Sequence, residues 1–138
     1  MAWSLTEYEN YIYSAHSLSP HIQSSGIVLI RRGKFLAEVA GEILFASDLS
    51  LQVREFLYFL SADFIRRYGY LVKKGGETQY WYDSQPHPND PSLQATHPHH
   101  KHIPPDLKHH RILAPGLSFH EPNLSYLIRE IGALFFVS

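Results

Sequence analysis

The stretch FIRRYGYLVKKGGETQYWYDS (residues 64–84) decides the fold, because two runs of aromatic and β-favouring residues flank a pair of glycines. Gly75 and Gly76 in that position are typical of the two-residue turn of a β-hairpin, since glycine readily adopts the positive φ angles that such turns need. The sequence therefore predicts an antiparallel hairpin formed by residues 64–73 and 78–84.

The register of this hairpin brings candidate binding residues to one side. With a two-residue turn, Tyr70 lies opposite Trp81 and Tyr68 lies opposite Asp83. Arg66 shares their face, so we expect one aromatic, basic and acidic patch at the open end of the ribbon. A shift by one residue would turn these side chains to the other side of the sheet.

Apolar runs upstream of the hairpin extend the sheet. Residues 27–30, 35–40 and 43–46 predict short antiparallel strands separated by glycines. Residues 49–60 fit the period of either a helix or a strand, and we favour a strand. In a strand, Glu55 points to the core side together with the apolar residues, which is an unusual place for a carboxylate.

A helix is predicted at each end of the chain. Ser4 and Glu7 have the spacing of a capping box, and Pro122 suits the first turn of a final helix. We therefore expect an α+β fold: an antiparallel, twisted sheet of about six strands flanked by N- and C-terminal helices. The predicted apolar stripe of the final helix consists of Leu124, Leu127, Ile128, Ile131, Leu134 and Phe135.

The composition limits the classes of protein. The 138 residues are 44% hydrophobic and 18% charged, which predicts a single domain over residues 1–138. Because there is no cysteine, disulfides, thiolate zinc sites and cysteine nucleophiles are excluded. With a formal net charge of -1, the chain lacks the overall positive charge that is typical of nucleic-acid binders. Without a signal peptide or a long apolar stretch, we expect a cytoplasmic protein with no membrane contact.

Histidines are concentrated in one proline-rich segment. Six of the ten histidines lie between residues 97 and 110, and His87 lies just upstream. Prolines at 86, 88, 91, 98, 104 and 105 exclude regular structure, so we predict a long loop over residues 85–105 that lies over one face of the sheet. Irregular loops of this length are often functional.

Imidazoles in such a loop suit acid–base cleavage of RNA. The reaction needs a base for the ribose 2′-OH, an acid for the leaving 5′ oxygen, and fixed positive charge near the phosphorane. In an extended segment alternate residues share a side, so His100 and His102 are the first candidates, with His99 and Lys101 on the other side. The fixed charge would come from Lys101, Arg66 or Arg67.

A metal site is the main alternative for this segment. His99, His100 and His102 could bind a cation together with Asp83. We expect neither a metal nor another cofactor, because the charge of Lys101 opposes a cation and no known zinc spacing is present.

The segments WYDSQPH (residues 81–87) and PHHKH (residues 98–102) resemble the TumE family of toxins from bacterial toxin–antitoxin modules. In that family a Glu-bearing strand precedes these segments and an amphipathic helix ends the chain, so the resemblance runs from about residue 26 to residue 136. It implies a toxin that is neutralised by a cognate antitoxin protein and that acts on RNA.

Together these observations predict a metal-independent endoribonuclease toxin. The alternatives are a non-catalytic RNA- or protein-binding module and a metal-dependent phosphodiesterase. The oligomeric state stays open, with a homodimer as one option. The candidate catalytic residues are His99, His100, Lys101, His102 and Glu55, and the candidate substrate-binding residues are Arg66, Arg67, Tyr68, Tyr70, Trp81, Tyr82, Asp83 and His87.

Overall fold

The computed structural model describes residues 3–84, 99–104, 111–114 and 116–136. Its helices and strands are, in chain order, α1 (Leu5–Tyr13), the 3-10 helix η1 (Ala15–Leu18), β1 (Ile22–Ser25), β2 (Val28–Arg31), β3 (Leu36–Phe45), the 3-10 helix η2 (Ala46–Asp48), β4 (Leu49–Tyr58), β5 (Ile65–Lys74), β6 (Glu77–Asp83), β7 (His100–His102), β8 (Arg111–Leu113) and α2 (Leu124–Phe135).

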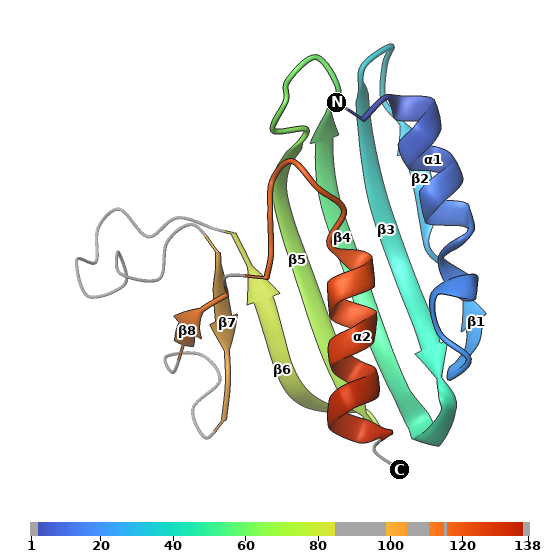
Figure 1. The fold of residues 1–138 in the computed structure, drawn as a ribbon, viewed down its shortest axis with the longest axis vertical. Helices are drawn as coiled ribbons and strands as arrows, with labels where there is room; N and C mark the ends of the chain where they lie inside the picture. Colours follow the sequence, from blue (N-terminus) through green and yellow to red (C-terminus); the bar gives the residue numbers. More distant parts are fainter. Residues whose placement is uncertain (1–2, 85–98, 105–110, 115, 137–138) are drawn as a thin grey trace.

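The strands form one antiparallel sheet, and α1 and α2 both cover the same face of it (Figure 1). The strand order is β1-β3-β4-β5-β6-β7-β8, and β2 pairs with the remaining part of β3. The predicted α+β fold is confirmed, with eight strands in the described residues instead of about six. We call the covered side the helix face and the other side the opposite face.

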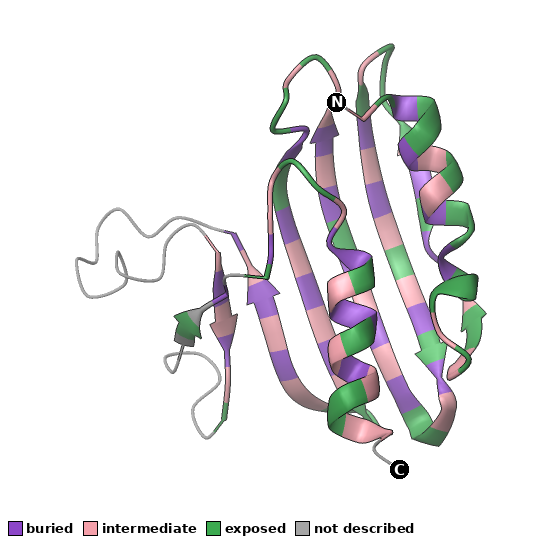
Figure 2. Cartoon of the chain, in the orientation of Figure 1, coloured by how far each residue is buried: buried purple, intermediate pink, exposed green. Residues whose placement is uncertain are grey.

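Alternating burial along the central strands explains why they form (Figure 2). Along β4, the residues from Leu49 to Leu57 alternate between buried and less buried positions, so the strand interpretation of residues 49–60 is confirmed. Glu55 is fully buried among the apolar residues of the helix face, as the strand period predicts. The two strands predicted over residues 35–46 are one continuous strand, β3, because Gly41 stays paired with Val53 of β4.

The hairpin of β5 and β6 turns at the two glycines, but its predicted register is wrong. A register shift between Val72 and Lys73 pairs Tyr70 with Tyr82, and Gly69 with Asp83. One extra residue in β6 therefore turns this strand over relative to the simple two-residue turn. As a result, Tyr68 and Tyr70 point to the helix face, whereas Trp81 and Asp83 point to the opposite face.

Both helices begin close to their predicted positions. The capping box of α1 is present: the amide of Glu7 donates to the Ser4 hydroxyl, and the Ser4 amide donates to the Glu7 carboxylate. Helix α2 begins after Asn123, so Pro122 lies outside it. Leu134 is 55% exposed, and the apolar stripe of α2 is shorter than predicted.

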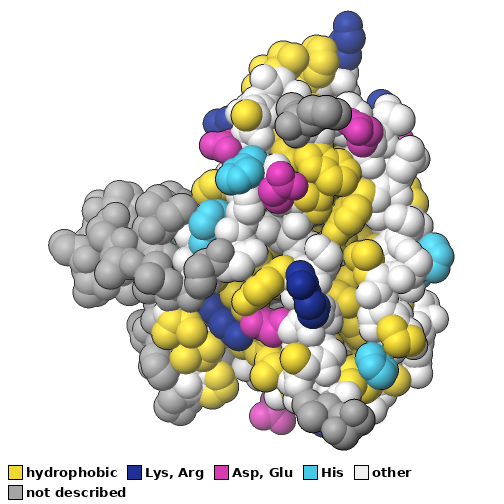
Figure 3. Space-filling view, viewed as in Figure 1, with side chains coloured by type: hydrophobic (Ala, Val, Ile, Leu, Met, Phe, Trp, Pro, Cys, Tyr) yellow, Lys and Arg dark blue, Asp and Glu magenta, His cyan; other side chains and the backbone are white. Residues whose placement is uncertain are grey.

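The surface of the helix face carries apolar side chains between α1 and α2 (Figure 3). The core below it contains the buried side chains of both helices, among them Tyr8, Leu127 and Ile131. No helix among the described residues is long and apolar enough to span a bilayer.

Part of the segment predicted as a loop is a strand. Residues His100–His102 form β7 and pair with β6, although prolines stand nearby at positions 98 and 104. Three consecutive residues without proline are enough to add a short strand to the edge of a sheet, because each keeps its amide donor. The other residues of the predicted loop, apart from His99, Ile103 and Pro104, lie outside the described residues.

Candidate functional site

The pairing of β7 with β6 fixes which histidines lie together. Asp83 pairs with His100, and Trp81 pairs with His102, so these four side chains share the opposite face of the sheet. Lys101 lies between the two histidines in the chain and therefore points to the helix face. The predicted alternation of residues 99–102 is confirmed.

His100 and His102 converge on one carboxylate. The Nε2 atom of His100 contacts Oδ1 of Asp83, and Nε2 of His102 lies 3.0 Å from Oδ2. Trp81 supports this arrangement, since its Nε1 donates to Oδ2 of Asp83 at 3.2 Å and its ring stacks on that of His102 at 4.2 Å. His100 is 1% exposed and His102 is 4% exposed. We call Asp83, His100 and His102 the Asp83 cluster.

The electrostatics of the Asp83 cluster keep the carboxylate ionised. Burial alone would raise the pKa of Asp83, but the hydrogen bonds and charges of His100 and His102 outweigh it, so the pKa lies well below its usual value. A carboxylate that stays charged at neutral pH can fix the orientation of both rings and stabilise an imidazolium.

Two pockets meet beside Asp83. One, the arginine pocket, has a volume of about 730 Å³, and the other, the tryptophan pocket, has a volume of about 720 Å³. Arg54, Gly69 and Asp83 line both, so the two pockets adjoin at these residues. The arginine pocket is lined by Arg54, Phe56, Arg66, Arg67, Tyr68, Gly69, Asp83 and Ser84, and the tryptophan pocket by Trp81, Leu71 and Gln52 among others.

The arginine pocket combines cations with an aromatic ring. The guanidinium groups of Arg67 and Arg54 lie 4.0 Å and 5.6 Å from the centre of the Phe56 ring. Arg66 and Arg67 were predicted to bind substrate, and both line this pocket. Arg54 and Phe56 were not among the predicted site residues, although as the neighbours of Glu55 in a strand they had to point to the face opposite that of Glu55.

Lys101 does not lie with the Asp83 cluster. Its Nζ forms an ion pair with Glu130 of α2 at 3.1 Å and lies 4.3 Å from the centre of the Tyr80 ring. Tyr82 also donates to Glu130, at 2.7 Å. The positive charge predicted to act beside the histidines is therefore paired on the helix face.

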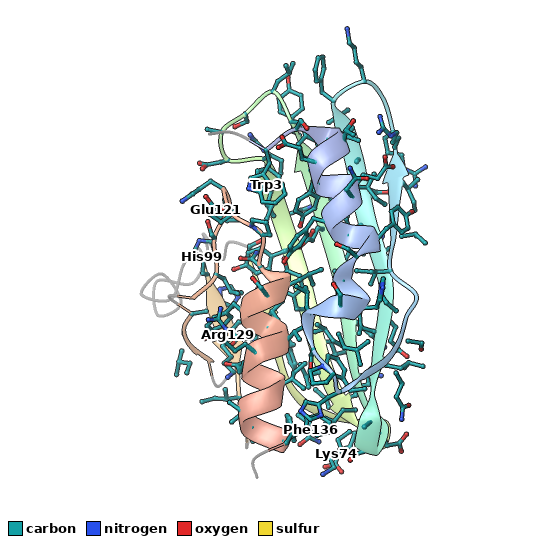
Figure 4. All side chains as sticks on the ribbon, turned by 45° about the vertical axis from the view of Figure 1, so that its right-hand side comes forward. Trp3, Lys74, His99, Glu121, Arg129 and Phe136 are labelled. Atoms are coloured by element: carbon teal, nitrogen blue, oxygen red, sulfur yellow. The ribbon has the colours of Figure 1, made fainter. Side chains whose placement is uncertain are left out.

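His99 is also separated from the cluster. Its Nδ1 lies 2.6 Å from the hydroxyl of Tyr68, and its ring centre lies 4.4 Å from that of Phe119. Figure 4 shows His99 near the segment that leads into α2, where Glu121 is labelled. Both residues line one pocket on that side of the molecule.

Glu55 forms a second buried polar group, away from the Asp83 cluster. Tyr8 donates to its carboxylate at 2.5 Å, Tyr70 donates to its other oxygen, and Asn123 donates to the Tyr70 hydroxyl at 3.0 Å. Burial raises the pKa of Glu55, although the two tyrosine hydrogen bonds oppose the rise. Glu55 lies on the helix face, so the structure does not bring it to His100 and His102.

The predicted aromatic contacts divide between the two faces. Tyr68 is 5% exposed, and Tyr70 and Tyr82 are 1% exposed, so these rings pack in the core. Of the four predicted aromatic contacts, Trp81 is the one whose side chain points to the opposite face, because it alternates with Tyr82 along β6. His87 lies outside the described residues.

The Asp83 cluster also has the composition of a metal site. Among the described residues, one nitrogen or oxygen from each of Asp83, His100 and His102 lies within 4.8 Å of the others. Two imidazoles and a carboxylate suit zinc and related divalent ions. The charge argument against a cation no longer applies, because Lys101 points to the other face and pairs with Glu130.

Comparison with known proteins identifies the family. No curated protein and no solved structure matches the chain. A family model described as Toxin TumE matches residues 9–135 of the 138, which include all the central strands, the Asp83 cluster and α2. The chain therefore belongs to the TumE toxin family.

Proposed function

We propose that this toxin is an endoribonuclease and that the Asp83 cluster is its catalytic centre. One observation carries the proposal: two imidazoles converge on an ionised carboxylate at the edge of a pocket lined by three arginines. This combination offers both proton exchange and fixed positive charge, which cleavage of a phosphodiester requires.

In the proposed reaction, one imidazole removes the proton of the ribose 2′-OH, and O2′ attacks the phosphorus. The bond from phosphorus to O5′ breaks while the second imidazole, in its protonated form, gives a proton to O5′. The products are a 2′,3′-cyclic phosphate and a free 5′-OH. Nε2 of His100 and of His102 faces Asp83, so in this proposal the carboxylate orients both rings and stabilises the protonated one.

Of the three cations predicted to stabilise the charge, Arg66 and Arg67 keep this role in the proposal, and Arg54 joins them in place of Lys101. Arg54, Arg66 and Arg67 line the pocket that Asp83 also lines, so a phosphate bound there lies among guanidinium groups. Guanidinium is suited to this role because it stays charged and can bind two phosphate oxygens at once.

A metal-dependent phosphodiesterase is the second candidate, and the same three side chains support it. If a divalent ion binds Asp83, His100 and His102, it would act as a Lewis acid on the phosphate or activate a water. The two candidates differ in one respect that can be measured, namely whether a chelator abolishes cleavage.

The toxin family also suggests an antitoxin protein as a partner. We propose that the antitoxin covers the pockets beside Asp83, since a near-neutral net charge suits a surface that alternates between RNA and a protein. If the toxin is instead non-catalytic and the same surface only binds RNA or protein, its toxicity would depend on Trp81 and not on the imidazoles.

The test uses purified full-length protein and a single-stranded RNA, with and without chelator. The proposal expects cleavage in chelator by the parent protein, a loss of about 10²- to 10⁴-fold in His100→Ala and His102→Ala, and normal cleavage by His16→Ala, which changes an exposed histidine of η1. Cleavage that disappears in chelator and returns with one divalent ion supports the second candidate. Intact RNA, with growth arrest that survives both cluster substitutions, contradicts both.

A further inference from the structure

We propose that the space above Gly69, between Arg54 and Asp83, is the binding site (the phosphate seat) for one phosphodiester group of a single-stranded RNA. The inference rests on the proposed function and names how that site recognises its substrate. It assigns Arg54 as the phosphate-binding residue.

The sheet register aligns these residues in one row. Arg54 of β4 pairs with Gly69 of β5, Gly69 pairs with Asp83 of β6, and Asp83 pairs with His100 of β7. Residues directly paired across antiparallel strands point to the same face. The row therefore runs across the opposite face from a guanidinium to the Asp83 cluster.

Gly69 leaves a gap in the middle of the row. Neighbouring strands lie about 4.8 Å apart, so the backbones of Arg54 and Asp83 are separated by roughly 10 Å. A Cβ atom added at Gly69 would meet no heavy atom within 4 Å, so the gap is open space and not a close approach of two chains. Gly69 also lines both pockets, which places the gap where they join.

The chemistry around the gap suits a phosphodiester with a base on each side. Arg54 and Arg67 supply positive charge on one side, and the ionised Asp83, which repels an anion, is covered by hydrogen bonds from two imidazoles on the other. Phe56 and Trp81 line the two pockets that extend from the gap. Aromatic side chains beside a cationic groove are the usual elements that hold single-stranded RNA.

The experiment measures binding apart from cleavage. A fully 2′-O-methylated single-stranded RNA has no attacking hydroxyl, and its affinity can be followed by fluorescence anisotropy at several salt concentrations. Two substitutions address the gap: Arg54→Gln removes the charge, and Gly69→Val fills the space. Two matched controls lie elsewhere: Arg129→Gln on an exposed position of α2, and Gly33→Val in a turn where an added Cβ also meets nothing. Figure 4 shows Arg129 on α2.

We expect Arg54→Gln to weaken binding by about tenfold and to lower the slope of log K against log salt by about 0.7, the value for one phosphate contact on a single strand. We expect Gly69→Val to weaken binding at least as much, and both controls to stay within about twofold of the parent. Thermal unfolding shows which variants are folded, and Arg54→Gln alone decides the matter if Gly69→Val does not fold.

The inference is overturned if the parent protein does not bind the oligonucleotide, or if Arg54→Gln binds it as tightly as the parent and with the same salt slope. The proposed function fails separately. If the oligonucleotide binds through Arg54 but cleavable RNA of the same sequence stays intact, the phosphate seat stands and the nuclease activity does not. If cleavable RNA is cut equally by the parent and Arg54→Gln, the proposed nuclease activity is supported and the proposed phosphate-binding role of Arg54 is refuted.

Discussion

Lys101 of β7 and Glu130 of α2 form an ion pair of 3.1 Å that ties the strand next to the sheet edge to the C-terminal helix. Each side chain is 16% exposed, and Tyr82 of β6 donates to the same carboxylate. The pair therefore holds β7 in register on the helix face, while His100 and His102 are presented on the opposite face.

Lys101→Gln is expected to lower stability without lowering catalysis. Loss of a partly buried ion pair should reduce the free energy of unfolding by about 1 kcal/mol, while the rate of RNA cleavage stays within about twofold of the parent. Urea unfolding and a cleavage assay measure the two effects, and Lys34→Gln, at an exposed turn, serves as the control. A cleavage rate that drops while stability is unchanged would instead show that Lys101 takes part in catalysis.

Glu55 should make stability fall as the pH rises. Burial raises its folded pKa above the ordinary value of 4.5, so the folded protein binds this proton more tightly than the unfolded chain does. The contribution is fully present below pH 4.5 and is lost as the pH rises through the raised pKa. The contribution of Asp83 to stability depends on pH in the opposite direction, because its lowered pKa gives stability that is lost only at acidic pH.

Unfolding midpoints across pH test this assignment. In Glu55→Gln the fall in stability above pH 4.5 should disappear, because the amide does not ionise, whereas Glu77→Gln, at an exposed position in β6, should keep the parent's profile. Glu55→Ala should cost about 2–5 kcal/mol, since the hydroxyls of Tyr8 and Tyr70 lose their acceptor. An unchanged pH profile in Glu55→Gln would refute the raised pKa.

Ser4→Ala should destabilise α1 by about 1 kcal/mol, because it removes the hydroxyl that accepts from the Glu7 amide. Thr6→Ala changes an exposed residue inside the same helix and should be neutral or slightly stabilising. Thermal unfolding compares the two. Equal midpoints for both variants would show that the capping box contributes little.

The sequence was sufficient where local rules act alone. Ser4 and Glu7 predicted the start of α1, and the period of β4 predicted that Glu55 would be buried. The spacing of residues 99–102 also predicted which histidines share a face, since alternation along an extended chain does not depend on tertiary structure.

Long-range pairing accounts for what the sequence did not reveal. The register shift at Val72 reversed the predicted partners of Tyr70, and no local pattern marks where a bulge will form. The ion pair between Lys101 and Glu130 could not be foreseen either, because the two residues lie 29 positions apart in the chain. β1 was missed because Ile22–Ser25 has no alternating apolar pattern and forms a strand only by pairing with β3.

The most direct test of the central claim is a double-mutant comparison of Asp83→Asn and His102→Ala in single-turnover cleavage of RNA. If Asp83 acts by orienting the imidazoles and stabilising their protonated form, Asp83 and His102 work as a unit. The double variant should then cleave RNA no more slowly than the slower of the two single variants. Losses that multiply in the double variant, or a parental rate in Asp83→Asn, would contradict a catalytic centre built on Asp83.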